Sequence, residues 1–371
     1  MSRTPMLLSV TFSLLALTFG ASTLSASTTY LVGTCKKGLK SFPSIGLALS
    51  APVPADVIEI CPGVYSEQVF LNQPVTLEGI SVGNSSGVYL QAPNQGQGPM
   101  VCEELSGGGA VAAEIMVNEG TAGAVNISSV TAFGPDDPPA GCFGAGIFYR
   151  NTPGTINNVA TDGPFEADSQ GNPLGIGIVL EGGSVNPHVT VENSVLTSYN
   201  HLGIWIETNS PTSEITATIK NNSVIPSTLV PSIPNSNGIQ IDGGSTVAIT
   251  GNNFFAEVCF IINGSSGVIS GNTGICNVAA ELSADGISIE SNKFLYGSGG
   301  IDIHVPLVDS AITGNTFSLV EEPILLNCNA PNGKVHSNII RDSPFGVIGL
   351  PAGETVPTTY INVKEEVIGC D

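Results

Sequence analysis

Three carboxylates occupy the same place in a recurring five-residue phrase. Glu181, Glu207 and Asp242 each end a stretch with the pattern Gly-Ile-x-Ile-x or a close variant of it. Because side chains alternate along a strand, the second and fourth residues of the phrase face a core, and the third and fifth face solvent. Neighbouring parallel strands lie about 4.8 Å apart, so stacked copies of the phrase would bring these carboxylates within roughly 5 Å of one another.

That spacing suits the hydrolysis of a glycosidic bond. Two carboxylates about 5–5.5 Å apart serve retaining enzymes, and a separation of about 6.5–9.5 Å serves inverting ones. We predict Glu207 and Asp242 as acid and base, Trp205 as a platform for a sugar ring, and Glu181 and Gln240 as substrate-binding residues. The same carboxylates could instead hold Ca²⁺, whose oxygen ligands lie at about 2.3–2.6 Å.

Two further copies of the phrase add titratable residues. Arg150 ends an earlier copy, and His304 ends a later one that carries Asp302 at its third position. Arg150 and His304 are predicted as catalytic helpers and Asp302 as a binding residue, with a further member of the fifth-position column near Glu281. The alternative is a solvated face without chemistry, because outward strand positions must be polar and the chain has 31 acids.

A second phrase, apolar-x-x-Asn, shows which elements carry these residues. It ends at Asn222, Asn252, Asn272, Asn292, Asn315 and Asn338, and Asn193 matches Asn222 with one residue deleted. The steps from Asn193 are 29, 30, 20, 20, 23 and 23 residues. Short strands at such a period, without helical patterning, predict a solenoid of stacked parallel strands. The repeated Asn is expected to turn the chain in a left-handed conformation and to bond along the stack.

The stretch "FPSIGLALSAPVPADVIEICPGVYSEQVFLNQPVTLEGI" (42–80) resembles the first turns of the pectin lyase-like superfamily. It holds a short amphipathic segment (Ile45, Leu47, Leu49), a strand ending in Pro-Gly-Val-Tyr, then Glu67 and a V-T-L-x-G strand. The resemblance runs from about 28 to 365. It implies an all-β fold, a single-stranded right-handed parallel β-helix with a short N-terminal amphipathic cap.

The resemblance does not by itself specify a reaction, because the superfamily includes lyases, hydrolases, esterases, epimerases and inert shafts. Pectin methylesterases carry a Gln-Asp pair that this sequence lacks, and the Asn-Thr-Asp, His-Gly and Arg-x-Lys motifs of polygalacturonases are also missing. Pectate lyases use acidic calcium ligands with a basic proton abstractor, for which Arg150 is the first candidate. If the protein is an enzyme, we therefore expect a polysaccharide lyase or a glycoside hydrolase.

The beginning of the chain and its cysteines indicate export. Arg3, the apolar run 6–19 and the small residues after it predict a signal peptide over 1–26, followed by a β-helix domain over 27–371. A single N-terminal anchor is the alternative. Eight cysteines predict four disulfides, for which we expect sequential pairing: 35–61, 102–142, 259–276 and 328–370. The protein is expected to be secreted, periplasmic or on the cell surface.

The formal net charge of −21 limits the partners. Such a chain repels nucleic acid, anionic lipid and polyanions, so a strongly anionic polymer is a poor ligand unless calcium bridges it. The loops 134–142 and 226–237 are rich in Pro and Ser and are expected to wall a groove over Trp205 and Asp242. We predict a monomeric protein that binds, and could cleave, an extracellular polysaccharide. The alternative is a structural or adhesive β-helix without activity.

Overall fold

The computed structural model describes most of the chain after the predicted signal peptide. Its described residues are 27–81, 87–93, 100–118, 123–135, 138–163, 175–208, 214–226, 236–307, 309–328 and 334–370. The predicted signal peptide (1–26) therefore lies outside the described residues, as does most of the predicted loop 226–237.

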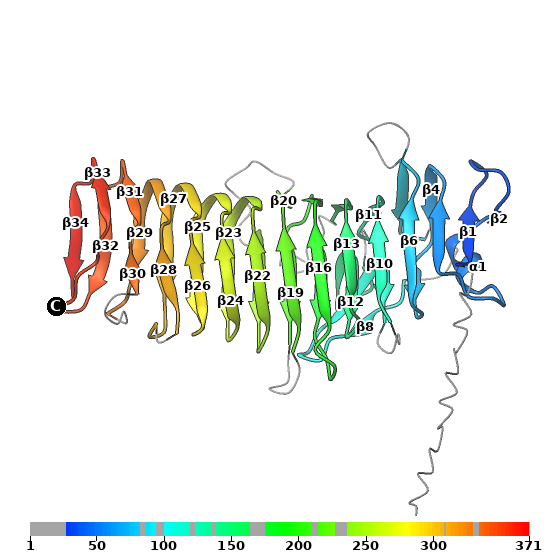
Figure 1. Cartoon of the computed structure of the whole chain (residues 1–371), viewed down its shortest axis with the longest axis horizontal. Helices are drawn as coiled ribbons and strands as arrows, with labels where there is room; N and C mark the ends of the chain where they lie inside the picture. Colours follow the sequence, from blue (N-terminus) through cyan, green and yellow to red (C-terminus); the bar gives the residue numbers. More distant parts are fainter. Residues whose placement is uncertain are drawn as a thin grey trace, which may run out of the picture.

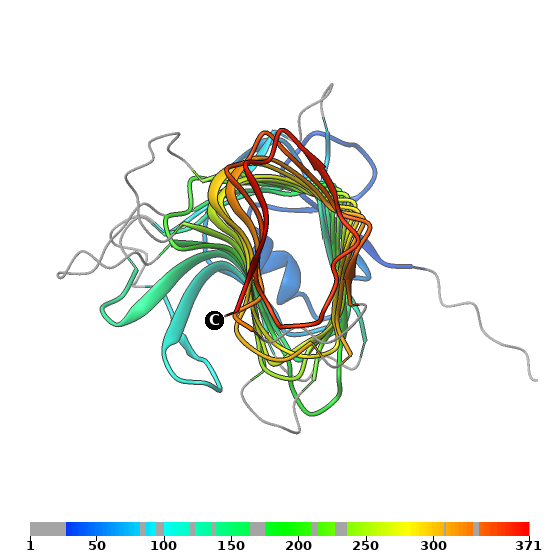
Figure 2. The same ribbon diagram turned by 90° about the vertical axis from the view of Figure 1, so that its left-hand side faces the viewer.

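Two long sheets of stacked strands build the described part of the chain, one of 13 strands and one of 21. Figure 1 shows the strands side by side along the long axis, and Figure 2 shows the successive coils lying over one another. The named strands of the described chain pair in parallel, with the exception of the antiparallel pair β8–β9. The predicted all-β class and the parallel β-helix are thus confirmed.

The 13-stranded sheet contains one short strand from nearly every coil. Its members are β1 (Thr29–Val32), β2 (Lys40–Phe42), β3 (Val57–Ile60), β6 (Val75–Gly79), β10 (Val125–Ser128), β13 (Gly154–Asn157), β16 (His188–Glu192), β19 (Thr216–Lys220), β22 (Thr246–Thr250), β24 (Ser266–Ser270), β26 (Ile287–Glu290), β28 (Ala311–Thr313) and β30 (Val335–His336).

The 21-stranded sheet contains the remaining strands and carries the Gly-Ile-x-Ile-x phrases. Its members are β4 (Gly63–Ser66), β5 (Val69–Leu71), β7 (Val88–Gln91), β8 (Glu103–Glu104), β9 (Ala110–Val117), β11 (Thr131–Phe133), β12 (Cys142–Arg150), β14 (Ala160–Asp162), β15 (Gly175–Glu181), β17 (Val195–Thr197), β18 (Leu202–Glu207), β20 (Ser223–Val224), β21 (Asn237–Asp242), β23 (Asn253–Asn263), β25 (Thr273–Ser283), β27 (Lys293–Ile303), β29 (Thr316–Leu325), β31 (Ile339–Arg341), β32 (Phe345–Leu350), β33 (Thr359–Ile361) and β34 (Glu365–Gly369).

The apolar residues of the phrase fill the interior of the coils, as predicted. In the strand β21, Ile239 and Ile241 are fully buried in the main core. The leading glycine is required by close packing, because a Cβ at Gly238 would lie 2.5 Å from the carbonyl oxygen of Cys259 in the next coil. The phrase is therefore first a packing unit, and only its third and fifth residues are available for function.

A ladder of buried asparagines runs through six consecutive coils. In this Asn ladder (Asn222, Asn252, Asn272, Asn292, Asn315 and Asn338), the backbone N–H and side-chain amide of each residue donate to the Oδ1 of the next. The side-chain amide also donates to a core carbonyl, as Asn272 does to Ile249 O at 2.9 Å. The predicted bonding along the stack is confirmed.

The predicted turning role of the ladder asparagines is wrong, as is the alignment of Asn193 with them. The left-handed residue is the one before each ladder position, for example Asn221 (φ 56°) and Gly251 (φ 66°). Glu192 pairs with Lys220, so Asn193 (φ 52°) corresponds to Asn221. The ladder instead ends at Ser194, whose N–H donates to Asn222 Oδ1 at 2.9 Å. A tight turn and a buried amide are thus carried by two different residues.

A five-residue helix, α1 (Ile45–Leu49), packs against the first strands. The side chain of Ser44 accepts from Leu47 N, and the Glu67 carboxylate accepts from the N–H groups of Ile45 and Gly46 at 2.8 Å each. The predicted apolar face was partly wrong. Ile45 and Ala48 are buried, whereas Leu47 is 53% exposed, because residues three apart share a helix face and residues two apart do not.

All eight cysteines are paired, in the sequential order predicted: 35–61, 102–142, 259–276 and 328–370. Within the described ranges, no helix is long and apolar enough to cross a membrane.

A buried carboxyl in β9 makes stability depend on pH. The Glu114 side chain is 0% exposed, and neither carboxyl oxygen has a hydrogen-bond partner among the described residues. Burial raises the pKa of the Glu114 carboxyl well above its usual range, and the charge of Glu67 adds to the shift. A raised pKa means that the native state favours the protonated form, so stability is fully present below the ordinary pKa and falls as the pH rises above it.

Replacing Glu114 by Gln is therefore expected to stabilise the protein at neutral pH. We expect Glu114→Gln to raise the free energy of unfolding by about 2–4 kcal/mol at pH 7 and to leave it nearly unchanged at pH 4. Urea unfolding at both pH values measures the difference. Glu78→Gln, at an exposed position of β6, is the control. An equal effect of Glu114→Gln at both pH values would contradict this account.

Candidate functional site

A second apolar cluster covers part of the outer strand face. This outer cluster consists of Leu105, Val111, Ala113, Met116, Ala145, Phe148, Ile176, Val179 and Leu202, with Phe70, Phe143 and Trp205 packed at its edge. The segment around β8 folds back antiparallel onto β9 and is tied to β12 by the Cys102–Cys142 disulfide. In Figure 2, the long strands β9 and β12 (cyan to teal) leave the outline of the other coils.

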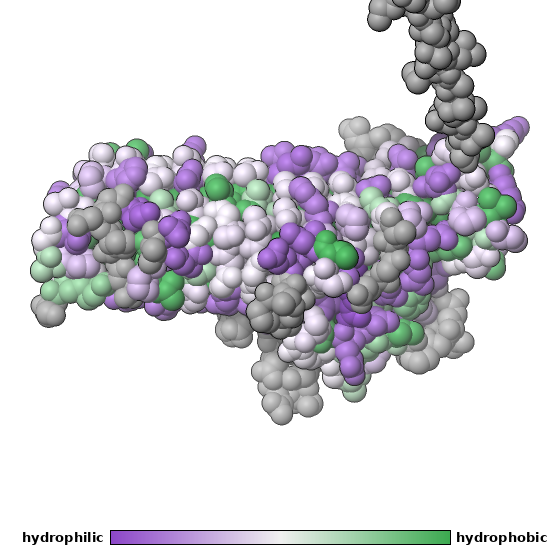
Figure 3. Space-filling view, turned by 60° about the horizontal axis from the view of Figure 1, so that its bottom comes forward, coloured by the Kyte–Doolittle hydropathy of each residue, from purple (hydrophilic) through white to green (hydrophobic). Residues whose placement is uncertain are grey.

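The outer cluster corrects the prediction that third and fifth positions face solvent. Phe148 and Val179 are fully buried, and Glu181 and Glu207 are only 2% and 4% exposed. Part of the physical reason is the segment 101–109: Leu105 packs in the same cluster as Phe148 and Val179, and Ser106 is hydrogen-bonded to Glu181. Figure 3 shows that hydrophilic residues gather over the middle of the visible face, where part of the molecule bulges from the solenoid.

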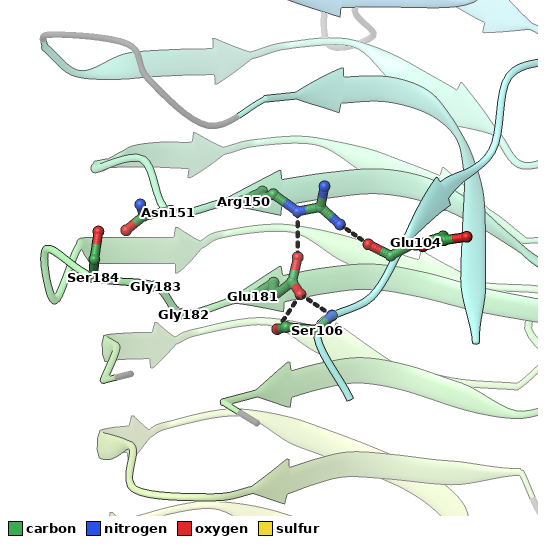
Figure 4. A pocket seen from close by; sticks show the side chains of 8 residues that line it. All are labelled: Glu104, Ser106, Arg150, Asn151, Glu181, Gly182, Gly183 and Ser184. Carbon is green, nitrogen blue, oxygen red and sulfur yellow. Dashed lines mark hydrogen bonds and ion pairs between the residues drawn. The ribbon is translucent and has the colours of Figure 1, made fainter. Parts of the chain in front are cut away.

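Arg150 and Glu181 fasten this covering segment to the sheet (Figure 4). The two residues pair in register on β12 and β15, and Arg150 Nε lies 2.5 Å from Glu181 Oε2. The backbone N–H and hydroxyl of Ser106 donate to Glu181 Oε1 at 2.6 and 2.5 Å. The Arg150 guanidinium also lies 3.4 Å from Glu103 Oε2 and donates to the carbonyl of Glu104. Arg150 is thus held by three groups: the carboxylates of Glu181 and Glu103 and the carbonyl of Glu104.

A polar cavity of about 320 Å³ lies beside Arg150 and Glu181. Glu104 and Ser106 line one side, Arg150 and Glu181 belong to the sheet, and residues 182–184 form the opposite turn. Among its described lining residues, Arg150 is the only cation, and its charge is balanced by Glu181 and Glu103. The cavity therefore offers hydrogen bonds without net positive charge.

Trp205 and Asp242 form the next part of the same face. Trp205 Nε1 donates to Asp242 Oδ2 at 2.8 Å, and Gln240 Nε2 donates to the same oxygen at 2.7 Å. Asn263 Nδ2 donates to the other carboxylate oxygen of Asp242 at 2.9 Å. Three donors thus fix the Asp242 carboxylate and, through it, the edge of the indole ring.

Two aromatic residues that the sequence analysis missed support Trp205. Phe143 meets Trp205 edge to face, with ring centroids 5.8 Å apart and an interplanar angle of 82°. His201 stacks on Phe143 at 5.8 Å and 11°. Burial lowers the pKa of the His201 imidazole, so the ring is neutral at physiological pH. Phe143 therefore contacts Trp205 directly, and His201 packs against Phe143 behind it.

The register places three predicted carboxylates in successive coils. Glu181 pairs with Glu207, and Glu207 pairs with Asp242, which in turn pairs with Asn263. The expected member near Glu281 is Ser283, which pairs with Asn263, whereas Glu281 itself pairs with Ile261 and Asp302 in the third-position column. The fifth-position residue of β25 is therefore Ser283, two residues after Glu281.

Asp302 and His304 lie away from this group. Asp302 belongs to β27, three strands beyond β21, which corresponds to roughly 14 Å at about 4.8 Å per strand. His304 Nε2 lies 3.5 Å from Asp302 Oδ2, and Asn327 Nδ2 donates to Asp302 Oδ1 at 2.7 Å. A cavity of about 300 Å³ beside Asp302 is also lined by Glu281, Glu321 and Glu322. The structure thus separates the predicted site residues into two groups.

Neither group forms a metal centre in the described part of the chain. No set of three or more His, Cys, Asp or Glu side chains there is arranged so that it could hold a metal ion. Glu181 is bound to Arg150 and Ser106, and Asp242 is bound to Trp205, Gln240 and Asn263. Each of these two carboxylates is thus engaged by its own protein partners.

Solved structures of other proteins share this architecture. A GH136 lacto-N-biosidase from Eubacterium ramulus matches with a TM-score of 0.56 and 13% identity, over 92% of this chain and 68% of that one. A DFA-IIIase from Arthrobacter chlorophenolicus A6 in complex with GF2 matches at 0.47 and 15%, over 91% and 89%. PfbA, a surface adhesin of Streptococcus pneumoniae, matches at 0.39 and 14%, over 84% and 85%.

The likeness to the lacto-N-biosidase, together with the parallel strands, confirms the fold expected from the resemblance. The chain has a right-handed parallel β-helix fold. No protein-family model matches the sequence, and no curated protein matches it closely enough to count as a relative. At these identities the likeness establishes the fold alone, and a fold does not specify a function.

Proposed function

We propose that the protein is exported and binds an uncharged polysaccharide on the outer face of β12, β15, β18 and β21. The observation that carries this proposal is the fixed, half-buried ring of Trp205, bonded at its N–H to Asp242 and held edge-on by Phe143. A sugar ring offers apolar C–H faces to such an aromatic ring and hydroxyls to the groups around it. Gln240 and Asn263 supply those groups beside Asp242.

The charge of the site argues for a neutral ligand. Glu103, Glu181, Glu207 and Asp242 all lie along this face, and the guanidinium of Arg150 is balanced by Glu181 and Glu103. A uronate polymer or a nucleic acid would meet excess negative charge at the site and across a chain of net charge −21. Arg150 and Glu181 act here by holding the 103–106 wall of the cavity.

Hydrolysis of the bound glycan by Glu207 and Asp242 is the second candidate function. It is favoured by their register, which sets the two residues on neighbouring strands about 4.8 Å apart, near the separation of retaining enzymes. Asp242, oriented by three donors, would form a bond to the anomeric carbon while Glu207 protonates the departing oxygen. Water, deprotonated by Glu207, would then release the sugar from Asp242 and restore both groups.

Removing the Trp205 ring tests the binding proposal. We expect Trp205→Ala to weaken binding of neutral oligosaccharides by about 10–100-fold, because stacking area and the order of Asp242 are both lost. Trp205→Phe should retain more affinity than Trp205→Ala. Glycan arrays followed by calorimetry on the retained sugars measure the change, and Phe345→Ala in β32, far along the solenoid, is a control. Unchanged affinity in Trp205→Ala would rule out this site.

A purely structural or adhesive β-helix is the competing account. It predicts no affinity for neutral glycans and no effect of Trp205→Ala beyond stability. Export through the 1–26 signal peptide is part of the proposal and is supported by four disulfides, which persist in oxidising compartments. N-terminal sequencing of the mature protein would identify the cleavage point.

A further inference from the structure

A separate cavity of about 270 Å³ opens on the outer face of the short strands β7, β11, β14 and β17. Its described lining shares no residue with the cavity at Arg150. The side chains that define it are those of Tyr89, Thr131, Asn158, Ala160, Asn193 and Val195. We call it the Tyr89 cavity.

The register explains why the surface is hollow there. Tyr89 pairs with Thr131, Thr131 with Ala160, and Ala160 with Val195, so the four side chains stand in one outward column. Thr131 and Ala160 are small, whereas Tyr89 and Val195 are large and stand 39% and 44% exposed at the two ends. The column spans roughly 14 Å, at about 4.8 Å per strand, along the solenoid axis.

The lining combines an aromatic wall with uncharged polar groups. The Tyr89 ring is braced by Phe133, with centroids 6.0 Å apart. Asn158 and Asn193 stand at left-handed turns (φ 53° and 52°) beside the column. Their amide nitrogens donate to Ser129 Oγ at 3.1 Å and to Asn157 Oδ1 at 2.9 Å, so their amide oxygens are the groups that can accept hydrogen bonds from a ligand.

The described lining of the Tyr89 cavity is uncharged, which favours a neutral ligand over an ion. The lining residues carry no acid or base, although the chain has 31 Asp and Glu and a formal net charge of −21. An ion gains nothing from such a cavity. A compact polyhydroxylated ring can make two favourable contacts here. Its apolar face can pack on Tyr89, and its hydroxyls can donate hydrogen bonds to the amide oxygens.

We propose that the Tyr89 cavity is a second, non-catalytic binding site for one or two rings of an uncharged glycan. The ring packs on Tyr89 and fills the space over Ala160, between Tyr89 and Val195. The amide oxygens of Asn158 and Asn193 accept hydrogen bonds from its hydroxyls. The site goes beyond the Trp205 face and does not depend on hydrolysis there. If one polymer reaches both sites, the second contact raises the overall affinity without new chemistry.

Affinity electrophoresis tests the proposal with defined probes. Gels containing a soluble β-glucan, a galactan or an arabinoxylan are compared with a gel containing polygalacturonate. The variants are Tyr89→Ala, which removes the wall, and Ala160→Arg, which fills the hollow. Ala248→Arg, at an outward position of β22 on the other sheet, makes the same change of size and charge elsewhere. Melting temperatures report whether each variant is folded.

We expect the wild type to be retarded by at least one neutral polymer and not by polygalacturonate. Tyr89→Ala and Ala160→Arg should each raise the dissociation constant by roughly 3–10-fold, and Ala248→Arg should not. The proposal is overturned if no neutral gel retards the wild type, or if both cavity variants migrate like their control. If only Trp205→Ala abolishes retardation, the Trp205 face survives and the Tyr89 cavity does not.

Discussion

Asn272→Ala is expected to lower the free energy of unfolding by about 3–5 kcal/mol, because it interrupts the Asn ladder in its middle. The substitution removes the Oδ1 that accepts from the backbone and side chain of Asn252 at 2.8 and 2.9 Å. It also removes the donor to Ile249 O. At least two buried backbone groups would then lack a partner, each at a cost of about 1–3 kcal/mol.

The neighbouring Asn253 provides the control for this effect. Asn253 is exposed at the start of β23 and lies next to a ladder residue in sequence. Asn253→Ala should change stability by less than about 0.5 kcal/mol, as surface substitutions usually do. Urea unfolding of the two variants measures the contrast. Equal midpoints for Asn272→Ala and Asn253→Ala would show that the ladder contributes no more than surface asparagines do.

Glu207→Gln and Asp242→Asn are each expected to reduce glycan hydrolysis by about 10²–10⁴-fold if the second candidate function is correct. Glu207→Gln removes the transferable proton but keeps the shape of the side chain. Asp242→Asn removes the charge that would form the bond to the sugar, although it can keep part of the contact with Trp205. The proton magnetic resonance spectrum of the first product should show retention of the anomeric configuration.

Glu290→Gln is the matched control for the activity measurements, because Glu290 is an outward residue of β26 on the other sheet. Reducing-end release by wild type and variants is compared at saturating substrate, together with binding. Loss of hydrolysis with retained binding in Glu207→Gln supports catalysis. Undiminished hydrolysis in both site variants would assign the reaction elsewhere, and binding without hydrolysis by the wild type would leave a lectin-like protein.

Most features of the coil, and some of the site, could be predicted from the sequence. The Gly-Ile-x-Ile-x phrase predicted which residues enter the core and placed Glu181, Glu207 and Asp242 on successive strands, because the strand period of two is strict. Left-handed positions were harder to identify: Asn, Gly and Ser all occupy them, as Asn221, Gly251 and Ser291 do. The prediction therefore assigned the turn and the buried hydrogen bonds to the same asparagine.

What the sequence could not provide is the covering of the outer face. Ser106 meets Glu181 across 75 residues of chain, and no periodic pattern links the two. The predicted Cys102–Cys142 disulfide was the one available signal, since it brings the segment after Cys102 to the start of a phrase-bearing strand. Phe143 and His201 lie outside the phrase and were not identified as supports of Trp205. Asp302 shares the sequence pattern of the site residues but lies three strands beyond Asp242. The pattern alone does not report how far apart two copies lie along the solenoid.

The most direct test of the central claim uses Trp205 itself, the only tryptophan of the chain. Its fluorescence therefore reports on the proposed glycan face without interference from a second indole. Titration of the wild-type protein with neutral oligosaccharides is expected to change the intensity and the emission maximum in a saturable manner, while oligogalacturonate should leave both unchanged. A spectrum that no neutral glycan alters, or that only the anionic sugar alters, would contradict the account.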